Sequence, residues 1–191
     1  MGDIFQEIDE EVRRDRLHKV WKDYGGYIIA GGVAIVLGVS ASVGWREYYK
    51  QRQEADSDRF VEATALAASG KFAEAAAAFQ TLSDEAADGY ALFARFRSAD
   101  ALKDSGDVAG SVQIFEGIAT DSAVDDLYRD LATLLAIMHT IDGGDPEAMR
   151  LRLTPLLADN AVWRHSAREL SGALALRTGD RELAKTEFQK L

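Results

Sequence analysis

Residues 24–45 read YGGYIIAGGVAIVLGVSASVGW and contain no charged side chain over 22 residues. At about 1.5 Å of rise per residue, a helix of this length extends roughly 33 Å, which matches a hydrocarbon core about 30 Å thick. Aromatic residues of the kind that prefer membrane interfaces stand at both ends of the stretch: Trp21, Tyr24, Tyr27, Trp45, Tyr48 and Tyr49. The sequence therefore predicts a single N-terminal transmembrane helix over 24–45.

Two alternatives remain open for this apolar stretch. A cleaved signal peptide would use the small residues Ser40, Ala41 and Ser42, but such peptides begin with a short basic region, and seven acidic residues precede Tyr24. A helix buried in a globular core is the other alternative, although core helices rarely stay uncharged on every face for about six turns. The transmembrane helix is the favoured interpretation.

The residues before the span predict an amphipathic leader over 1–23. Apolar residues recur there at roughly helical spacing between charges: Ile4, Phe5, Ile8, Val12, Leu17, Val20 and Trp21. Five Lys and Arg residues flank the span on this side and four on the other, which is a slight bias toward a cytoplasmic N-terminus. Because long domains cross membranes largely regardless of charge, we expect the C-terminal domain outside. In a bacterium, the helix would lie in the inner membrane and the domain in the periplasm.

The composition excludes several classes of function. The chain has 191 residues and a net charge of -10, and the part from Arg46 onward holds 25 acidic and 17 basic residues. A nucleic-acid partner is not expected, because a basic footprint is missing, and anionic lipid would repel the domain from the bilayer surface. The chain has no cysteine, which excludes disulfides, thiolate nucleophiles and cysteine-based metal sites.

The polar stretch at 46–56 predicts a helical linker, because it lacks both Pro and Gly. An internal repeat follows over residues 57–191. The repeat aligns on four glycines that are 36, 38 and 35 residues apart: Gly70, Gly106, Gly144 and Gly179. Large apolar residues stand nine and twelve positions after each glycine: Phe79, Leu82, Phe115, Ile118, Leu153, Leu156, Phe188 and Leu191. The pattern predicts an all-α domain in which about four helix pairs stack, since one pair cannot bury its own face.

Local signals define the expected helix ends. Each glycine permits a tight turn at positive φ, and small residues five positions later, Ala75, Ser111 and Ala184, would let helices approach closely. Three acidic residues follow the glycines as predicted N-caps, namely Asp107, Asp145 and Asp180, with Pro146 in the first turn of its helix. We expect a distorted third repeat, because Ile137 replaces a small residue and Pro155 interrupts the second helix.

The spacing G-[DK]-[FV]-x-x-[AS]-x-x-x-F-x-x-[LI] resembles the second half of tetratricopeptide repeats, whose period is 34. More narrowly, the leader IDEEVRRDRLHKVWKDYG, the span directly after it and the C-terminal repeats together resemble the YfgM-like family of ancillary subunits of the bacterial Sec translocon. The resemblance implies an inner-membrane protein with periplasmic repeats. It also implies partners: the translocon channel, a membrane-anchored periplasmic chaperone of the prolyl-isomerase type, and exported polypeptides.

A second function stays open beside this one. A structural adaptor for another envelope assembly, such as cell division or cytochrome maturation, would use the same anchor and repeats. The chain ends at Leu191, the last consensus position of the fourth repeat, so we expect either a truncated sequence or another protein that covers this end.

Catalytic chemistry is not expected. None of the three histidines, His18, His139 and His165, has a second ligand or a base at helical spacing. The glycine pairs match no phosphate loop, because no Gly-Lys-Ser/Thr follows them. We therefore expect neither an enzyme nor a cofactor or metal site.

Two sets of residues are candidates for binding. Small residues four apart form a stripe on the predicted transmembrane helix, where they would admit another helix: Gly26, Ala30, Ala34, Gly38 and Ser42. Apolar residues on the first helices of the pairs would line a peptide groove: Phe60, Phe93, Phe96, Leu131, Leu134 and Met138. Bacterial spans are rich in Gly and Ala in any case, and ordinary helix packing would also explain the groove residues.

Overall fold

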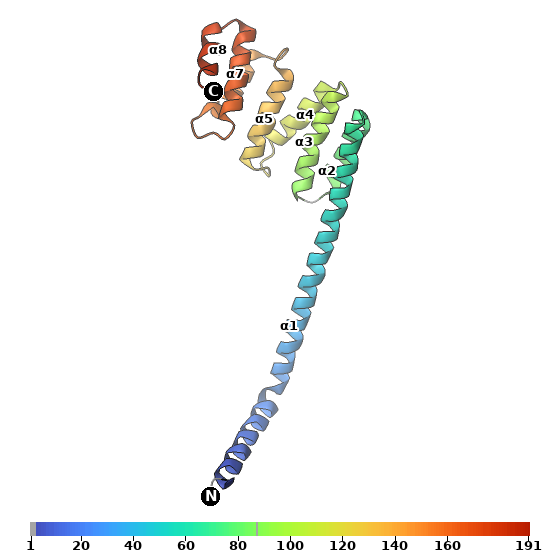
Figure 1. Ribbon diagram of the computed structural model, residues 1–191, viewed down its shortest axis with the longest axis vertical. Coiled ribbons are helices and arrows are strands. Elements are labelled where there is room, and N and C mark those ends of the chain that lie inside the picture. Colours follow the sequence, from blue (N-terminus) through green and yellow to red (C-terminus); the bar gives the residue numbers. More distant parts are fainter. Residues whose placement is uncertain (1–2, 87) are drawn as a thin grey trace. The chain divides into compact units, whose positions relative to one another are not determined.

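The computed structural model describes the backbone of residues 3–86 and 88–191, and the side chains of residues 18–19, 21–86 and 89–191. Within these residues the chain is helical and contains no strand, which confirms the predicted all-α fold. Figure 1 shows the order of the elements, which are α1 (Asp3–Ala68), α2 (Phe72–Glu85), α3 (Asp88–Asp104), α4 (Val108–Ala119), α5 (Asp126–Thr140), α6 (Pro146–Leu153), the 3-10 helix η1 (Thr154–Leu157), α7 (Arg164–Thr178) and α8 (Arg181–Phe188).

The chain divides into two units, residues 1–53 and residues 54–191. The first unit lies wholly within α1, apart from residues 1–2. Among the described helices, α1 alone is long and apolar enough to cross a membrane, by length and composition. None of its apolar window is buried within the chain, whereas a helix of a globular core would be largely covered. It is therefore a candidate membrane span.

The residues on either side of this span are also helical. The leader lies in α1 from Asp3 onward, but most of the side chains that would form its amphipathic face lie outside the described residues. On the other side, α1 continues through 46–56 and ends only at Ala68, so its last turns form the first helix of the repeat domain.

The second unit is built from helix pairs, as predicted. The end of α1 pairs with α2, α3 with α4, α5 with α6, and α7 with α8, and the pairs follow one another along the chain (Figure 1). Three clusters of buried apolar residues fill the spaces between them. Each cluster takes side chains from neighbouring pairs, so no pair provides a complete core by itself.

Three of the four repeat glycines form the same turn. Gly70, Gly106 and Gly179 have φ values of 79°, 97° and 83°. In each turn the next residue donates its N–H to the carbonyl five positions earlier, for example Asp107 to Leu102 at 2.9 Å. This is the Schellman motif, and its left-handed residue favours glycine because a Cβ is strained there.

Gly144 does not follow this pattern, so the prediction of a positive φ is wrong at the third turn. The N–H groups of Gly143 and Gly144 both donate to the carbonyl of Thr140, and the turn is longer than the other three. A Cβ on Gly144 would lie 2.2 Å from Cε of Met149 and 3.1 Å from the Thr140 carbonyl oxygen. Glycine is needed here for close approach rather than for its backbone angle.

The predicted N-caps are confirmed. Side-chain oxygens of Asp107, Asp145 and Asp180 accept hydrogen bonds from backbone N–H groups two or three residues later, at 2.8, 3.0 and 3.0 Å. Pro146 stands at the start of α6, where its missing N–H costs nothing. These contacts satisfy donors that a helix cannot pair internally.

The repeat positions pack as predicted in three repeats and differ in the fourth. Phe79 and Phe115 are fully buried and Leu153 is 1% exposed, whereas Phe188 is 39% exposed. The Phe188 ring nevertheless packs against the small residue expected on the preceding helix, since a Cβ on Gly172 would lie 2.8 Å from it. The fourth pair thus keeps the internal contact of the repeat, while part of its outer apolar surface stays exposed.

The third pair is distorted, as expected. Its second helix, α6, ends at Leu153, and the 3-10 helix η1 follows with Pro155 inside it. Proline has no N–H to donate and its ring clashes with the preceding turn, so an α-helix does not continue through it. Arg177 of α7 then holds the wide turn before α6, donating to the carbonyls of Ile141 and Gly144, the second at 2.7 Å.

The glycine turns lead to a test of stability. Gly106→Ala places a Cβ on a left-handed residue and should destabilise the domain by about 1–2 kcal/mol. Gly117→Ala is the matched control on the adjacent helix, where Ala is favoured over Gly by about 0.5–1 kcal/mol and the new Cβ makes only an ordinary contact. Denaturant unfolding of the full chain in detergent measures both changes. Equal effects at the two positions would contradict the role assigned to the turn.

Candidate protein-binding surface and membrane helix

One exposed face of the repeat domain runs over the first helices of the pairs. Phe93 and Leu131 each stand thirteen residues before their repeat glycine, and Asp100 and Met138 each stand six before it. Equivalent positions in stacked repeats face the same way, so these residues of α3 and α5 share one face. The Phe93 and Tyr128 rings join the two helices there, with centroids 6.0 Å apart. We call this surface the first-helix face.

The structure divides the six predicted groove residues into two groups. Phe93 and Met138 are exposed, at 48% and 46%, and both lie on the first-helix face. The other four contribute to the domain core: Phe96 and Leu134 are buried, and Phe60 and Leu131 are partly buried and pack against core clusters. Assigning Phe96 and Leu134 to a groove was wrong.

Helix geometry gives the reason. Phe96 stands three residues after Phe93, a rotation of about 300°, which turns it toward α4 instead of solvent. Its ring lies 5.9 Å from that of Phe115. Leu134 stands in the same relation to Leu131 and packs in the cluster that joins α5 to α6 and α7. The sequence pattern located the helices correctly. It assigned Phe96 and Leu134 to the same surface as Phe93 and Leu131, although they lie on a different face of each helix.

The charged residues of the first-helix face are mostly paired. Arg97 lies 3.8 Å from Asp100, and Lys103 lies 3.4 Å from Asp104. Burial raises the pKa of Asp100 above its usual value, and Arg97 partly offsets this. The face thus combines apolar side chains, ion pairs and one partly desolvated carboxylate, that of Asp100.

The structure brings together one pair that sequence reasoning missed. Ser111 Oγ of α4 lies 3.1 Å from Nδ1 of His139 on α5, and the His139 ring packs against Phe115 with centroids 5.2 Å apart. The two residues are 28 positions apart, so a search for partners at helical spacing within one element does not find them. A hydroxyl beside an imidazole is the start of a nucleophile–base pair. Ser111 is fully buried, however, so a substrate does not reach its oxygen.

The other histidines have simpler surroundings. His18 and His165 are exposed, and His165 lies beside Arg164, 3.4 Å from its guanidinium. Across the residues that the structure describes, no group of three or more His, Cys, Asp or Glu side chains is arranged to hold a metal ion.

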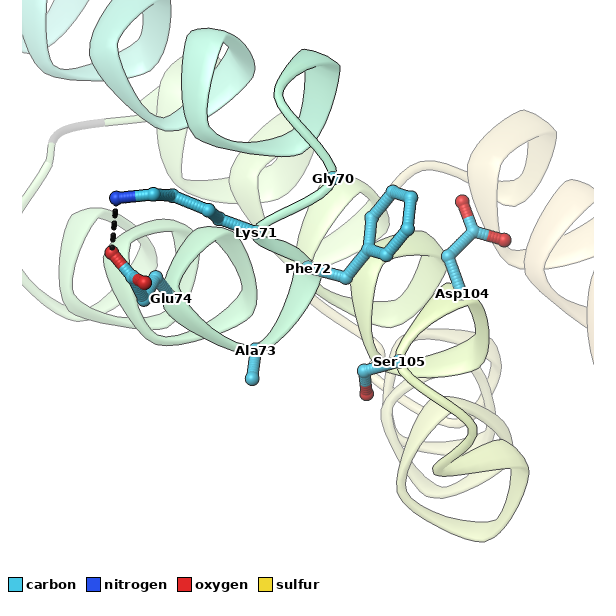
Figure 2. A pocket seen from close by; sticks show the side chains of 7 residues that line it. All are labelled: Gly70, Lys71, Phe72, Ala73, Glu74, Asp104 and Ser105. Atoms are coloured by element: carbon cyan, nitrogen blue, oxygen red, sulfur yellow. Dashed lines mark hydrogen bonds and ion pairs between the residues drawn. The ribbon is translucent and has the colours of Figure 1, made fainter.

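A shallow depression lies between the turn of the first pair and the turn of the second. It has a volume of about 350 Å³ and is lined by Gly70, Lys71, Phe72, Ala73, Glu74, Asp104 and Ser105. Figure 2 shows the ion pair at its edge, where Lys71 Nζ lies 3.4 Å from Glu74 Oε2, and the Phe72 ring directed toward the second turn. Ser105 Oγ donates to the carbonyl of Leu102 at 2.7 Å. The depression is open, and Lys71, Glu74, Asp104 and Ser105 at its walls already have partners within the protein.

The small-residue stripe lies in the candidate membrane span. All five positions, Gly26, Ala30, Ala34, Gly38 and Ser42, fall in α1 and are exposed. A Cβ added at Gly26 or Gly38 would meet nothing within 4 Å, so this side of the helix is open to a neighbour. Aromatic side chains pack on one another at the following end of the span, with the Trp45 and Tyr49 rings 5.1 Å apart.

Comparison with known families decides what this arrangement is. A family model described as a tetratricopeptide repeat-like domain matches residues 18–191, which include the apolar part of α1 and all four helix pairs. The chain belongs to the tetratricopeptide repeat-like domain family. Searches among curated proteins and among solved structures gave no match.

The family assignment relates the first-helix face to protein binding. Tetratricopeptide repeat-like domains stack helix pairs into extended surfaces, and they serve as adaptors between proteins. In this tetratricopeptide repeat-like chain, Phe93 and Met138 are two apolar side chains exposed on that surface.

Proposed function

We propose that this tetratricopeptide repeat-like protein is a single-pass membrane adaptor that binds other proteins and has no catalytic activity of its own. In this proposal residues 24–45 span the bacterial inner membrane, the leader is cytoplasmic and the repeat domain lies in the periplasm. One observation supports it most strongly: a protein-binding type of repeat, with Phe93 and Met138 exposed, is in the same chain as a candidate membrane span.

We further propose the setting in which it acts. The resemblance of the leader, span and repeats to ancillary subunits of the Sec translocon favours the translocon channel as a partner. A membrane-anchored periplasmic chaperone of the prolyl-isomerase type and exported polypeptides are the expected partners of the repeats. The alternative is a structural adaptor for cell division or cytochrome maturation, which would have the same architecture and a different neighbour.

Photocrosslinking separates these settings. Photoreactive residues at Ala34 and at Phe93 in the full chain, used in native membranes, capture neighbours of the span and of the first-helix face. Phe93 is preferable to Phe96 because Phe96 is buried. The proposal expects the channel from Ala34 and a chaperone or exported polypeptide from Phe93. Division or cytochrome-maturation proteins would support the alternative, and the absence of any captured protein at both positions would contradict the adaptor role.

The exposed residues of the first-helix face provide a direct prediction. Phe93→Ser together with Met138→Ser removes two apolar side chains that contribute roughly 1–2 kcal/mol each when buried by a partner, so recovery of periplasmic partners should fall about tenfold or more. Leu151→Ser is the control, because Leu151 is 76% exposed and lies on α6, outside this face. Co-purification of partners with the full-length variants is the measurement. An equal loss from the Leu151 control would argue against a specific face.

The small-residue stripe on α1 leads to a second prediction about partner binding. Ala34→Leu together with Gly38→Leu places bulk on the small-residue side and should weaken association with a membrane partner, since close backbone approach is lost. Val36→Leu together with Val43→Leu adds bulk on the opposite side of the helix and serves as the control. Recovery of membrane partners from native membranes compares the two. If the stripe variant retains its partners, the stripe is not the contact surface.

A further inference from the structure

The junction between the second and third helix pairs contains a titratable group in its packing. His139 of α5 is partly buried, its Nδ1 is hydrogen-bonded to Ser111 Oγ at 3.1 Å, and its ring makes a T-shaped contact with the Phe115 ring at 5.2 Å between centroids. Ser111 and Phe115 of α4 are both fully buried. At the same repeat position as Ser111, the other pairs have Ala75, Met149 and Ala184, none of which forms such a hydrogen bond to a titratable side chain.

The charged groups that act on His139 come from a third helix. Asp100, Lys103 and Asp104 of α3 face it, while α4 contributes the uncharged Ser111 and Phe115. Burial lowers the pKa of His139 below its usual value of about 6.5, and Lys103 acts in the same direction, whereas Asp100 and Asp104 oppose them. The imidazole is therefore neutral at neutral pH in the packed junction that the structure shows.

We propose that this junction, made by Ser111, Phe115 and His139, is a proton-sensitive joint of the repeat array, closed while His139 is neutral and loosened when it gains a proton. A protonated ring places a charge against the buried face of α4. The carboxylates of Asp100 and Asp104 on α3 favour the charged ring, so the two sides of the joint act on it in opposite senses. Because the array is stacked pair by pair, weakening one junction affects the register between α3 and α5 while the other pairs stay folded.

The direction of the pH effect follows from linkage. A histidine whose pKa is lower in the closed junction than in the opened one stabilises the closed form above about pH 6.5, and this contribution falls as the pH drops below that value. Asp100 acts in the opposite sense at lower pH, because protonation relieves the burial of its carboxylate. The window for the joint therefore lies below neutrality but above the range in which ordinary carboxylates titrate.

Partner binding is a consequence that rests on the proposed function. Phe93 and Met138 lie on α3 and α5, on either side of the joint. Loosening the joint would change the distance between them, so a partner that contacts both should be held near neutral pH and released on acidification. The joint itself is testable without any partner.

The first test is titration of the histidines in the full chain, reconstituted in nanodiscs and labelled at the imidazole carbons. The chain has only three histidines, and His→Gln variants assign their signals. His139 should titrate at lower pH in the folded chain than in the same chain unfolded in denaturant, because burial lowers its pKa. If folding leaves the titration of His139 unchanged, the joint is not proton-sensitive and the proposal is overturned.

The second test locates the opening. Amide hydrogen exchange of the full chain at about pH 7.5 and about pH 5.5, corrected for intrinsic rates, should show α4 and α5 losing protection at the lower pH while α7 and α8 keep it. His139→Gln can still hydrogen-bond Ser111 but does not gain a proton, so it should abolish this difference, whereas the control His165→Gln should retain it. If His139→Gln keeps the pH-dependent loss, the proposal fails. If that variant does not fold, the titration and exchange of the unmodified chain decide.

Discussion

One constraint shapes the repeat domain: two short helices packed on each other cannot bury all of their own apolar side chains. The buried clusters therefore draw on neighbouring pairs, and the largest fully buried side chains, Phe79 and Phe115, stand at the repeat position that faces the next pair. Stability is thus distributed over interfaces between pairs rather than concentrated in one core. Contacts across one repeat length reinforce these interfaces, such as the two hydrogen bonds from Arg152 to Glu116 at 2.6 and 3.0 Å.

This arrangement also separates structure from binding. Buried residues of both helices in each pair carry the packing, and one face of the first helices stays exposed. On that face the side chains vary from repeat to repeat, with Phe93 and Leu131 at one equivalent position, and Asp100 and Met138 at another. Of these four, Phe93 and Met138 are exposed, whereas Leu131 also packs against a core cluster. The same stacking makes a single junction, such as the one at His139, able to change without unfolding the others.

The third repeat shows how a departure from the pattern is accommodated. Pro155 shortens the second helix, and the turn before it is wide and lacks a left-handed glycine. Arg177 from the following pair supplies hydrogen bonds to carbonyls of this turn, and Gly144 admits the Met149 side chain. A defect that is local in sequence is therefore stabilised from a different repeat.

The sequence by itself determined the features that depend on neighbouring residues. The uncharged run at 24–45, the glycine turns at Gly70, Gly106 and Gly179, and the aspartate caps depend on hydropathy, backbone angles and hydrogen bonds within a few positions, so local patterns were enough to predict them. Only the tertiary structure decided which residues of a helix face solvent and which meet another pair. Phe96 and Leu134 are buried, and Ser111 meets His139, because rotations within each helix and the stacking of pairs bring distant residues together. Residue spacing along one helix gives the angle between two side chains, but not which of them faces the neighbouring pair.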